Sequence, residues 1–228
     1  MKSARRFCRF LGYGARAALR NLVLPLTVGI SGAAAAEPVT VAALGDSLTQ
    51  GYGLPADLGL VPQLQGWLKG QGSEVEVVNA GVSGDTTAGG LSRIDWTLTP
   101  EVDALIVELG GNDLLRGLPP EEARRNLSGI LGKARARGLL VLLIGLPAPG
   151  NYGPEYKAAF DAIWPELSAQ YGTLLMPDLL APIRAAVEAG IPPDHLMQMD
   201  GIHPSEAGVS RIVQVLGPQV QALVAQVK

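Results

Sequence analysis

The chain has 228 residues, of which 47% are hydrophobic and 17% are charged, and this composition excludes a disordered chain. Its length fits one globular domain or two small ones. The formal net charge at neutral pH is −3, from 18 basic and 21 acidic residues.

The first 36 residues have the three parts of a secretory signal peptide. Basic residues occur from Lys2 onward with no acidic residue before Glu37, an apolar run covers residues 22–30, and small residues end at Ala36. The alternative is a membrane anchor, but the run is shorter than the ~20 residues that span a bilayer, and Pro25 interrupts it. We expect residues 1–36 to be removed and residues 37–228 to fold as one domain in the periplasm or outside the cell.

Removal of this segment changes the charge and the cysteine content of the chain. Six of the 18 basic residues and none of the 21 acidic ones lie in residues 1–36, so the remainder carries 12 against 21, a charge of −9. This balance disfavours nucleic acid and anionic membranes as partners. The single cysteine, Cys8, is lost as well, which excludes disulfides and thiolate metal sites from the mature chain. We expect a monomer without stable membrane insertion.

Short β-rich runs alternate with amphipathic stretches along residues 37–228. The expected strands are apolar on both faces in several cases, as in a parallel sheet covered by helices, and they are Val39–Leu44, Val75–Val78, Ala104–Leu109, Leu139–Leu146 and Thr173–Met176. The expected helices lie near Val61–Lys69, Thr86–Leu98, Glu121–Arg137, Tyr156–Tyr171 and Leu179–Ala189. This alternation predicts an α/β fold, a three-layer α/β/α sandwich around a parallel five-stranded sheet.

A last helix is expected near the C-terminus. Val209, Ile212, Val213 and Leu216 recur at helical spacing and form one apolar face. The pair Gly217-Pro218 is expected to break or kink this helix, because proline cannot donate to the helical hydrogen-bond ladder.

The loop after the first strand contains a candidate nucleophile. Gly45-Asp46-Ser47-Leu48 places Ser47 where a buried strand turns into a helix. Alone this is a common turn sequence, and Thr49 makes it differ from the Gly-x-Ser-x-Gly elbow of α/β-hydrolases.

An Asp-x-x-His turn before the last helix contains a candidate base. A serine hydroxyl needs an adjacent base, and the base needs a group that orients it. Asp200 lies three residues before His203, so its carboxylate can accept from one imidazole nitrogen while the other faces the serine. For an isolated pair, a capping or turn role for Asp200 and packing of His203 at a helix start are the favoured interpretation. His195 has no comparable setting, and a two-histidine metal site lacks further ligands.

Two further loops contain candidate donors to an oxyanion. Val82-Ser-Gly84-Asp-Thr86 follows the second strand and opens a helix, whose N–H groups favour negative charge. Gly110-Gly-Asn112-Asp113 follows the third strand, and the Asn112 amide can donate to the same oxygen. Helix capping and a turn are the alternatives for these loops. Each loop is a weak signal, but all four can meet at one edge of one sheet.

In chain order the four blocks are Gly45-Asp-Ser47-Leu, Gly81-x-x-Gly84, Gly110-Gly-Asn112-Asp and Asp200-x-x-His203-Pro. Their order and spacing resemble those of the SGNH hydrolases, also called the GDSL lipase/esterase family. The resemblance covers essentially the whole of residues 37–228. Asn79–Thr87, Glu108–Gly117 and Asp200–Ser205 are similar to the periplasmic branch that contains multifunctional thioesterase/lysophospholipases and arylesterases. The resemblance implies Ser47 as nucleophile, His203 as base and then acid, and Asp200 as orienting residue.

The same resemblance implies an oxyanion hole made by the Ser47 and Gly84 N–H groups and the Asn112 side chain. It implies neither a metal nor an organic cofactor. The loop Leu146–Pro154 resembles one that lines the acyl pocket in that branch, with Leu146 and Tyr152 as substrate-binding candidates, although a plain surface connection fits as well.

The expected activity is hydrolysis of small carboxylic esters by a serine esterase through an acyl-enzyme. Aryl esters, short-to-medium acyl esters, acyl thioesters and lysophospholipids are all compatible with these residues. Two alternatives use the same fold: a carbohydrate acetylesterase with a smaller pocket, and a catalytically silent protein that binds a small acid or sugar. A nucleotide-binding role is disfavoured, because Gly51-x-Gly53 lacks the third glycine of the dinucleotide fingerprint.

Overall fold

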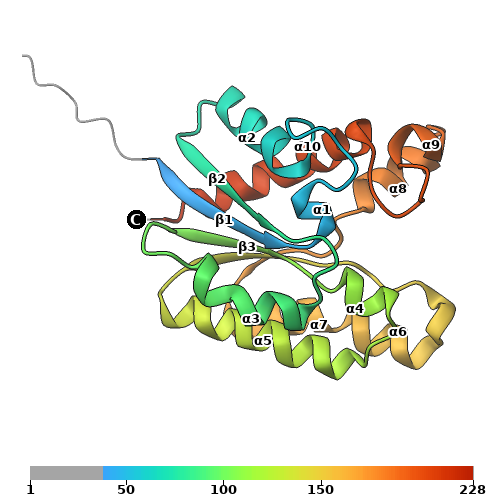
Figure 1. Cartoon of the computed structure of the whole chain (residues 1–228), viewed down its shortest axis with the longest axis horizontal. Helices are drawn as coiled ribbons and strands as arrows, with labels where there is room; N and C mark the ends of the chain where they lie inside the picture. Colours follow the sequence, from blue (N-terminus) through green and yellow to red (C-terminus); the bar gives the residue numbers. More distant parts are fainter. Residues whose placement is uncertain (1–37, 228) are drawn as a thin grey trace, which may run out of the picture. The chain divides into compact units, whose positions relative to one another are not determined.

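Five parallel strands form the centre of the structure, a computed structural model that describes residues 38–227 (Figure 1). Their order across the sheet is β2-β1-β3-β4-β5. The strands are β1 (Val39–Gly45), β2 (Val75–Gly81), β3 (Ala104–Glu108), β4 (Leu140–Ile144) and β5 (Leu174–Met176). Every residue of β3 is buried, as expected for a central parallel strand with both faces covered. The five predicted strands are confirmed, with ends that shift by up to three residues.

Helices cover both faces of this sheet in two layers (Figure 1). One face packs against α2 (Leu60–Gly70), α8 (Ala181–Glu188) and α10 (Glu206–Val224). The other packs against α3 (Thr87–Thr97), α5 (Pro120–Ala136), α6 (Pro154–Asp161) and α7 (Ile163–Tyr171). The three-layer α/β/α fold is therefore confirmed. Short helical turns α1 (Ser47–Gln50), α4 (Gly111–Leu115), η1 (Gly150–Tyr152) and α9 (Pro193–Leu196) lie in the connections.

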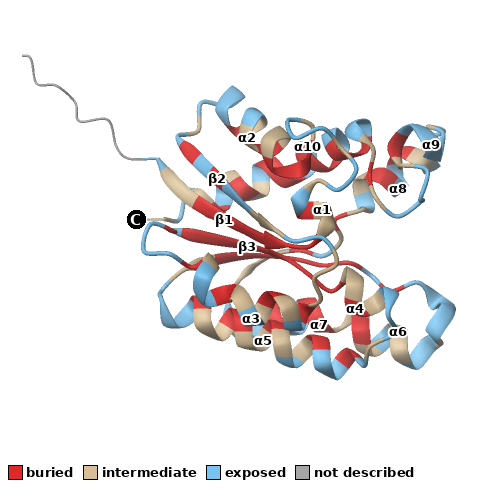
Figure 2. Cartoon of the chain, viewed as in Figure 1, coloured by how far each residue is buried: buried red, intermediate tan, exposed pale blue. Residues whose placement is uncertain are grey.

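Alternation along β1 divides the apolar core into two halves. Val41 and Ala43 face the α2/α10 layer, whereas Ala42 and Leu44 face the α3/α5 layer, because successive side chains of a strand point to opposite faces. Figure 2 shows the strands buried between helices whose outer sides are exposed. Each fully buried valine or leucine contributes about 1.5–3 kcal/mol of transfer free energy, so both layers hold the sheet.

The helix expected over Tyr156–Tyr171 is in fact two helices. α6 ends at Asp161 and α7 begins at Ile163. In a continuous helix the ring of Pro165 would clash with the carbonyl group of Asp161, and its missing N–H would leave that carbonyl unpaired. The single-helix prediction is wrong for this reason.

The predicted break at Gly217-Pro218 is also wrong, because α10 continues through both residues to Val224. Beyond the proline, Val220 and Leu223 are buried in the core, and their burial compensates for the hydrogen bond that proline cannot make. Gly217 lies against the Trp67 ring of α2, where an added Cβ would come within 2.6 Å of ring carbons. The glycine therefore allows close packing of the two helices.

Strand register brings four loops to the same edge of the sheet. Gly45 at the end of β1 pairs with Gly81 of β2 and with Glu108 of β3, and Glu108 pairs with Ile144 of β4. The loops that follow these strands therefore leave the sheet at one level, where parallel α/β sheets place their functional residues.

Within residues 38–227, no helix combines the length and the apolar character that a membrane crossing requires. The predicted signal peptide, residues 1–36, lies outside the described residues.

Candidate active site

Ser47 is the first residue of the short helix α1, directly after β1. The Asp46 side chain caps this helix by accepting from the Leu48 N–H at 3.0 Å. Gly45 is required before it, because a Cβ there would overlap the Thr49 side chain and lie 2.9 Å from the Glu108 carbonyl oxygen. The strand therefore turns into the helix within two residues, and Ser47 is presented half-buried at the sheet edge.

Ser47, His203 and Asp200 form one continuous chain of hydrogen bonds. His203 Nε2 lies 2.9 Å from Ser47 Oγ, and His203 Nδ1 lies 2.6 Å from Asp200 Oδ2. An ionised carboxylate only accepts, so Asp200 places the imidazole proton on Nδ1, and Nε2 is left to accept from the serine hydroxyl. These are the contacts that a serine hydrolase needs.

The Asp200–His203 turn is held by its own backbone. Asp200 Oδ1 accepts from the N–H groups of Ile202 and His203 at 2.9 and 3.0 Å. Together with the imidazole contact, these bonds lower the pKa of Asp200 from 3.8 to about 2, and the His203 backbone N–H is the largest cause. The carboxylate is therefore ionised at neutral pH.

Tyr52 and Gln198 support the histidine, and the sequence analysis identified neither. The ring of Tyr52 lies 4.7 Å from the imidazole, between centroids, at a tilt of 40°. Gln198 donates its backbone N–H to the His203 carbonyl at 2.7 Å. Its side chain donates to the Tyr52 carbonyl at 2.8 Å. Tyr52 and Gln198 are 146 residues apart, so no local pattern could reveal this contact.

The two predicted oxyanion loops lie beside the serine. Gly84 has φ +83°, a conformation that favours glycine, and its carbonyl accepts from Arg116 at 2.7 Å. Asn112 lies in the first turn of α4 and donates through Nδ2 to Asp46 Oδ2 at 3.1 Å. Within residues 38–227 the N–H groups of Ser47 and Gly84 have no hydrogen-bond partner, so both can receive an oxyanion.

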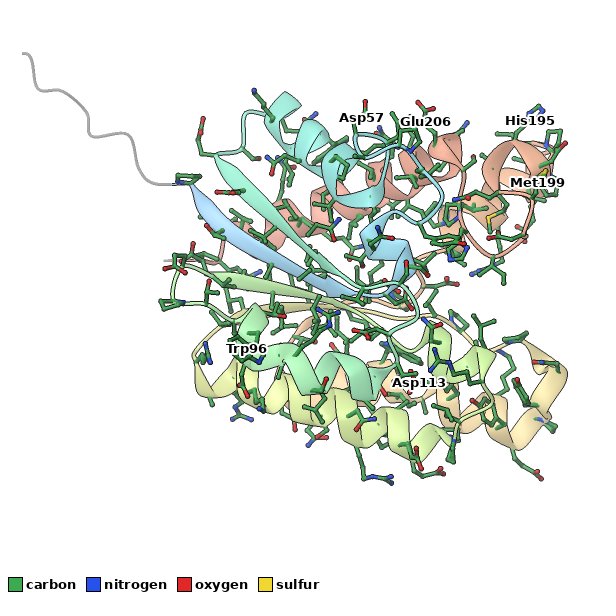
Figure 3. The ribbon with its side chains drawn as sticks, viewed as in Figure 1. Asp57, Trp96, Asp113, His195, Met199 and Glu206 are labelled. Carbon is green, nitrogen blue, oxygen red and sulfur yellow. The ribbon has the colours of Figure 1, made fainter. Side chains whose placement is uncertain are left out.

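Two side chains fix these loops relative to the serine. The guanidinium of Arg93 donates to Asp85 at 2.6 Å, to the Ala80 carbonyl at 2.7 Å and to the Gly45 carbonyl at 2.9 Å. Asp113, a buried residue of α4 (labelled in Figure 3), accepts from the N–H of Thr87, the first residue of α3, at 2.8 Å. The ends of β1 and β2 and the starts of α3 and α4 are therefore tied together.

Known proteins are similar to this chain in sequence and in fold. Residues 43–211 match the GDSL-like Lipase/Acylhydrolase family. Esterase TesA of Pseudomonas aeruginosa is 42% identical over 185 residues, which cover 81% of this chain and 89% of that protein. Thioesterase 1/protease 1/lysophospholipase L1 of Escherichia coli K12 is 38% identical over 193 residues, 84% of this chain and 87% of that protein. The chain belongs to the GDSL hydrolase family.

A solved relative has the same architecture. The psychrotrophic esterase EstA from Pseudoalteromonas sp., inhibited by monoethylphosphonate in that structure, superposes with a TM-score of 0.73 at 30% identity, over 82% of this chain and 99% of that one. The family assigns the protein to the serine esterases rather than to silent binding proteins, and its substrates are small-molecule esters.

An apolar cavity of about 300 Å³ opens beside the nucleophile of this GDSL hydrolase. Leu146 lines it, whereas Tyr152 does not. The Tyr152 ring lies against Gly117 and is 5.0 Å from the Tyr156 ring, between centroids, at a tilt of 42°. The structure therefore brings only one of the two substrate-binding candidates to the site. The other apolar side chains of the wall are Leu48, Leu114, Leu115, Pro147, Pro149, Leu180, Met197 and Ile202.

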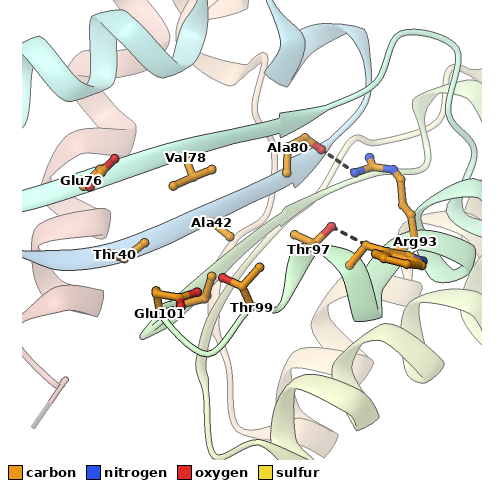
Figure 4. Close-up of a pocket in the computed structure, with 11 residues that line it drawn as sticks. Thr40, Ala42, Glu76, Val78, Ala80, Arg93, Thr97, Thr99 and Glu101 are labelled. Atoms are coloured by element: carbon orange, nitrogen blue, oxygen red, sulfur yellow. Dashed lines mark hydrogen bonds between the residues drawn. The ribbon is translucent and has the colours of Figure 1, made fainter.

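A larger cavity of about 450 Å³ lies along β2 and the C-terminal end of α3 (Figure 4). Glu76 and Val78 of β2 form one side, and Trp96, which is 85% exposed, borders it. It contains neither Ser47 nor His203, so it lacks a nucleophile with a base. The apolar cavity beside Ser47 is therefore the candidate substrate site.

His195 lies on α9 and points away from the protein (Figure 3), as expected for a surface histidine. Across residues 38–227, no three histidine, cysteine or acidic side chains are grouped so that they could hold a metal ion.

Proposed function

We propose that Ser47 is the nucleophile, His203 the general base and then acid, and Asp200 the residue that orients His203. The observation that carries this proposal is the hydrogen-bonded chain from Ser47 Oγ through the imidazole to Asp200, with heavy-atom distances of 2.9 and 2.6 Å. His203 takes the hydroxyl proton as Ser47 attacks the ester carbonyl, and then protonates the leaving group. Water, deprotonated by the same imidazole, releases the acid from the acyl-enzyme.

The charge that develops on the carbonyl oxygen is stabilised by three donors. The N–H groups of Ser47 and Gly84 and the side-chain amide of Asn112 surround the position of this oxygen. Such donors are preorganised by the protein and contribute most when the charge has formed, so they lower the barrier more than they strengthen substrate binding.

The acyl group occupies the cavity lined by Leu146. Its wall is mainly leucine, proline and methionine, which suits an alkyl chain or an aromatic ring. A volume of about 300 Å³ at the surface favours short-to-medium acyl groups over long-chain triglycerides. Aryl esters fit the same description, and the name of the E. coli relative adds acyl thioesters and lysophospholipids as substrate classes.

The esterase acts after export as a monomer. Residues 1–36 are a cleaved signal peptide, and the mature enzyme comprises residues 37–228 in the periplasm or outside the cell. N-terminal sequencing of the exported protein tests this assignment, and a mature N-terminus at Glu37 is expected.

Hydrolysis of p-nitrophenyl acetate, butyrate and octanoate by the wild type and by Ser47→Ala tests the proposed reaction. We expect activity that is greatest on short-to-medium chains and that is lost in Ser47→Ala. Activity confined to acetate would favour the carbohydrate acetylesterase, and retention of activity in Ser47→Ala would remove the proposed nucleophile.

A further inference from the structure

Glu108 is a carboxyl group buried beneath the nucleophile that the proposed reaction does not use. It ends β3 and is 0% exposed. Its Oε2 accepts from the Thr49 hydroxyl at 2.8 Å and from the Asp46 N–H at 3.5 Å. Its Oε1 is buried and has no partner in residues 38–227. A buried polar atom without a partner costs about 1–3 kcal/mol, so this carboxyl requires an explanation.

Asp46 is the acidic neighbour of Glu108. It is 2% exposed, its backbone N–H donates to Glu108 Oε2 at 3.5 Å, and the two carboxyl groups are close enough for each to shift the pKa of the other. Two donors already face Asp46: Leu48 N–H at 3.0 Å on Oδ1 and Asn112 Nδ2 at 3.1 Å on Oδ2. Asp46 therefore connects the buried glutamate to a proposed oxyanion donor.

Two adjacent carboxyl groups in the interior cannot both be ionised at neutral pH. Burial raises the pKa of both, and the Asp46 charge raises that of Glu108 further, to well above its usual value. The N–H of Leu48, the amide of Asn112 and the charge of His203 oppose the increase at Asp46. The guanidinium of Arg93 donates to the Gly45 carbonyl, next to Asp46, but its carboxylate partner is Asp85. The contacts of Asp46 with Leu48 and Asn112 stabilise its charged form more than that of Glu108, so a single proton on the pair favours Glu108.

We propose that Glu108, as a neutral acid, donates a hydrogen bond to the Asp46 carboxylate, and that Asp46 in turn fixes the orientation of the Asn112 amide toward the oxyanion. Both are positioning residues, and the inference rests on the proposed roles of Ser47 and Asn112. We place the proton on Oε1, the atom without a partner, so that this oxygen donates to Asp46 while Oε2 accepts from Thr49 and the Asp46 N–H.

The orientation of the Asn112 amide is the reason why this contact matters. The O and N of an asparagine side chain have nearly the same shape, but only the N donates. A carboxylate accepts and never donates, so it selects the rotamer with Nδ2 toward Asp46 and leaves the second N–H for the oxyanion. In the reversed amide the oxygen would approach Asp46, and repulsion between acceptors disfavours that state.

A set of variants tests this positioning role by steady-state kinetics on p-nitrophenyl butyrate. Asp46→Asn can accept or donate and no longer selects one amide orientation, so we expect kcat to fall about 10- to 100-fold with KM unchanged. In the Asn112→Ala background the same substitution is expected to cost nothing further. Multiplicative losses in the double variant would overturn the proposal, since Asp46 would then act independently of Asn112.

Glu108 is tested with one conservative and one disruptive substitution. Glu108→Gln keeps a donor for Asp46 and an acceptor for Thr49, so kcat is expected to stay within about threefold of wild type, whereas Glu108→Met, without polar atoms, is expected to lose about tenfold in kcat at unchanged KM. An equal loss in both variants would overturn the role of the donated hydrogen bond.

Infrared spectroscopy provides a readout that survives poor folding of the methionine variant. The wild type at neutral pH is expected to show the C=O stretching band of a buried protonated carboxyl, and Glu108→Gln is expected to lack it. Absence of this band from the wild type would contradict the proposal. Ser47→Ala and Asn112→Ala distinguish failure of the proposed site from failure of the positioning role. If both retain full activity, the proposed site is wrong. If both lose activity but Asp46→Asn leaves kcat unchanged, only the positioning role is wrong.

Discussion

Replacement of Asn112 by alanine removes one proposed oxyanion donor and one hydrogen bond to a buried carboxylate. The first loss concerns only the transition state, and we expect kcat to fall about 10²- to 10³-fold, or roughly 2.7–4 kcal/mol, with little change in KM. The second concerns the folded state. Asp46 Oδ2 loses the donor that lies at 3.1 Å, so the free energy of unfolding is expected to fall by about 1–3 kcal/mol.

Two measurements on the same preparations separate these effects. Initial rates on p-nitrophenyl butyrate, normalised to titrated active sites, give kcat and KM, and urea denaturation gives the free energy of unfolding. The matched control is Asn151→Ala, an exposed asparagine that does not line the cavity, which should change neither. Wild-type kcat in Asn112→Ala would refute the reasoning, and so would an increase in KM that accounts for the whole loss of kcat/KM.

Three other perturbations have expected outcomes. Asp200→Asn removes the acceptor that sets the imidazole tautomer, so kcat measured on the same ester should fall by about 10³–10⁴. The pKa of Asp200 is lowered to about 2 in the folded state, so its contribution to stability is present above its unfolded pKa and is lost as pH falls through about 4 to 2. Acid titrations followed by circular dichroism should show that the stability difference between the wild type and Asp200→Asn disappears over this range. Equal acid stability of the two proteins would contradict this. Leu146→Phe should shift the preference of the p-nitrophenyl ester series toward shorter acyl chains, and an unchanged chain-length profile would place the acyl group elsewhere. Gly217→Ala forces a methyl group against the Trp67 ring and should lower the free energy of unfolding by about 1–3 kcal/mol. The control Gly66→Ala changes a helix position with no atom near its Cβ and should raise the free energy of unfolding by about 0.5–1 kcal/mol. Equal effects of the two substitutions would refute the packing argument.

Local sequence patterns were sufficient for the layers of the fold. β3 is buried along its whole length and apolar from Ala104 to Val107, and such a run has one stable place in an α/β protein, the middle of a parallel sheet. The split between α6 and α7 also had a local signal, since Pro165 cannot occupy the interior of a continuous helix. The continuation of α10 through Pro218 also had a local signal, because Val220 and Leu223 continue the apolar spacing of Leu216, and both are buried in the core.

Local patterns account for only part of the site. Ser47 lies in the recognisable turn after β1, and Asp200 and His203 lie in the loop between α9 and α10, where their short Asp-x-x-His spacing gave the signal. The contacts that support the site join residues far apart in the sequence, so no local pattern predicts them. Glu108 reaches Asp46 across 62 residues, and Gln198 reaches the Tyr52 carbonyl across 146. Tyr152 was selected for its aromatic ring, but its neighbours Tyr156 and Gly117 hold that ring away from the cavity.

Covalent labelling of the nucleophile tests the central claim most directly. The enzyme is incubated with an activated ethylphosphonate ester, a tetrahedral mimic of the attacked carbonyl, and the adduct is located by mass spectrometry of the digested protein. We predict one adduct per chain, on Ser47, that is absent from Ser47→Ala and forms far more slowly in His203→Ala. An adduct on another residue, or stoichiometric labelling of Ser47→Ala, would contradict the account.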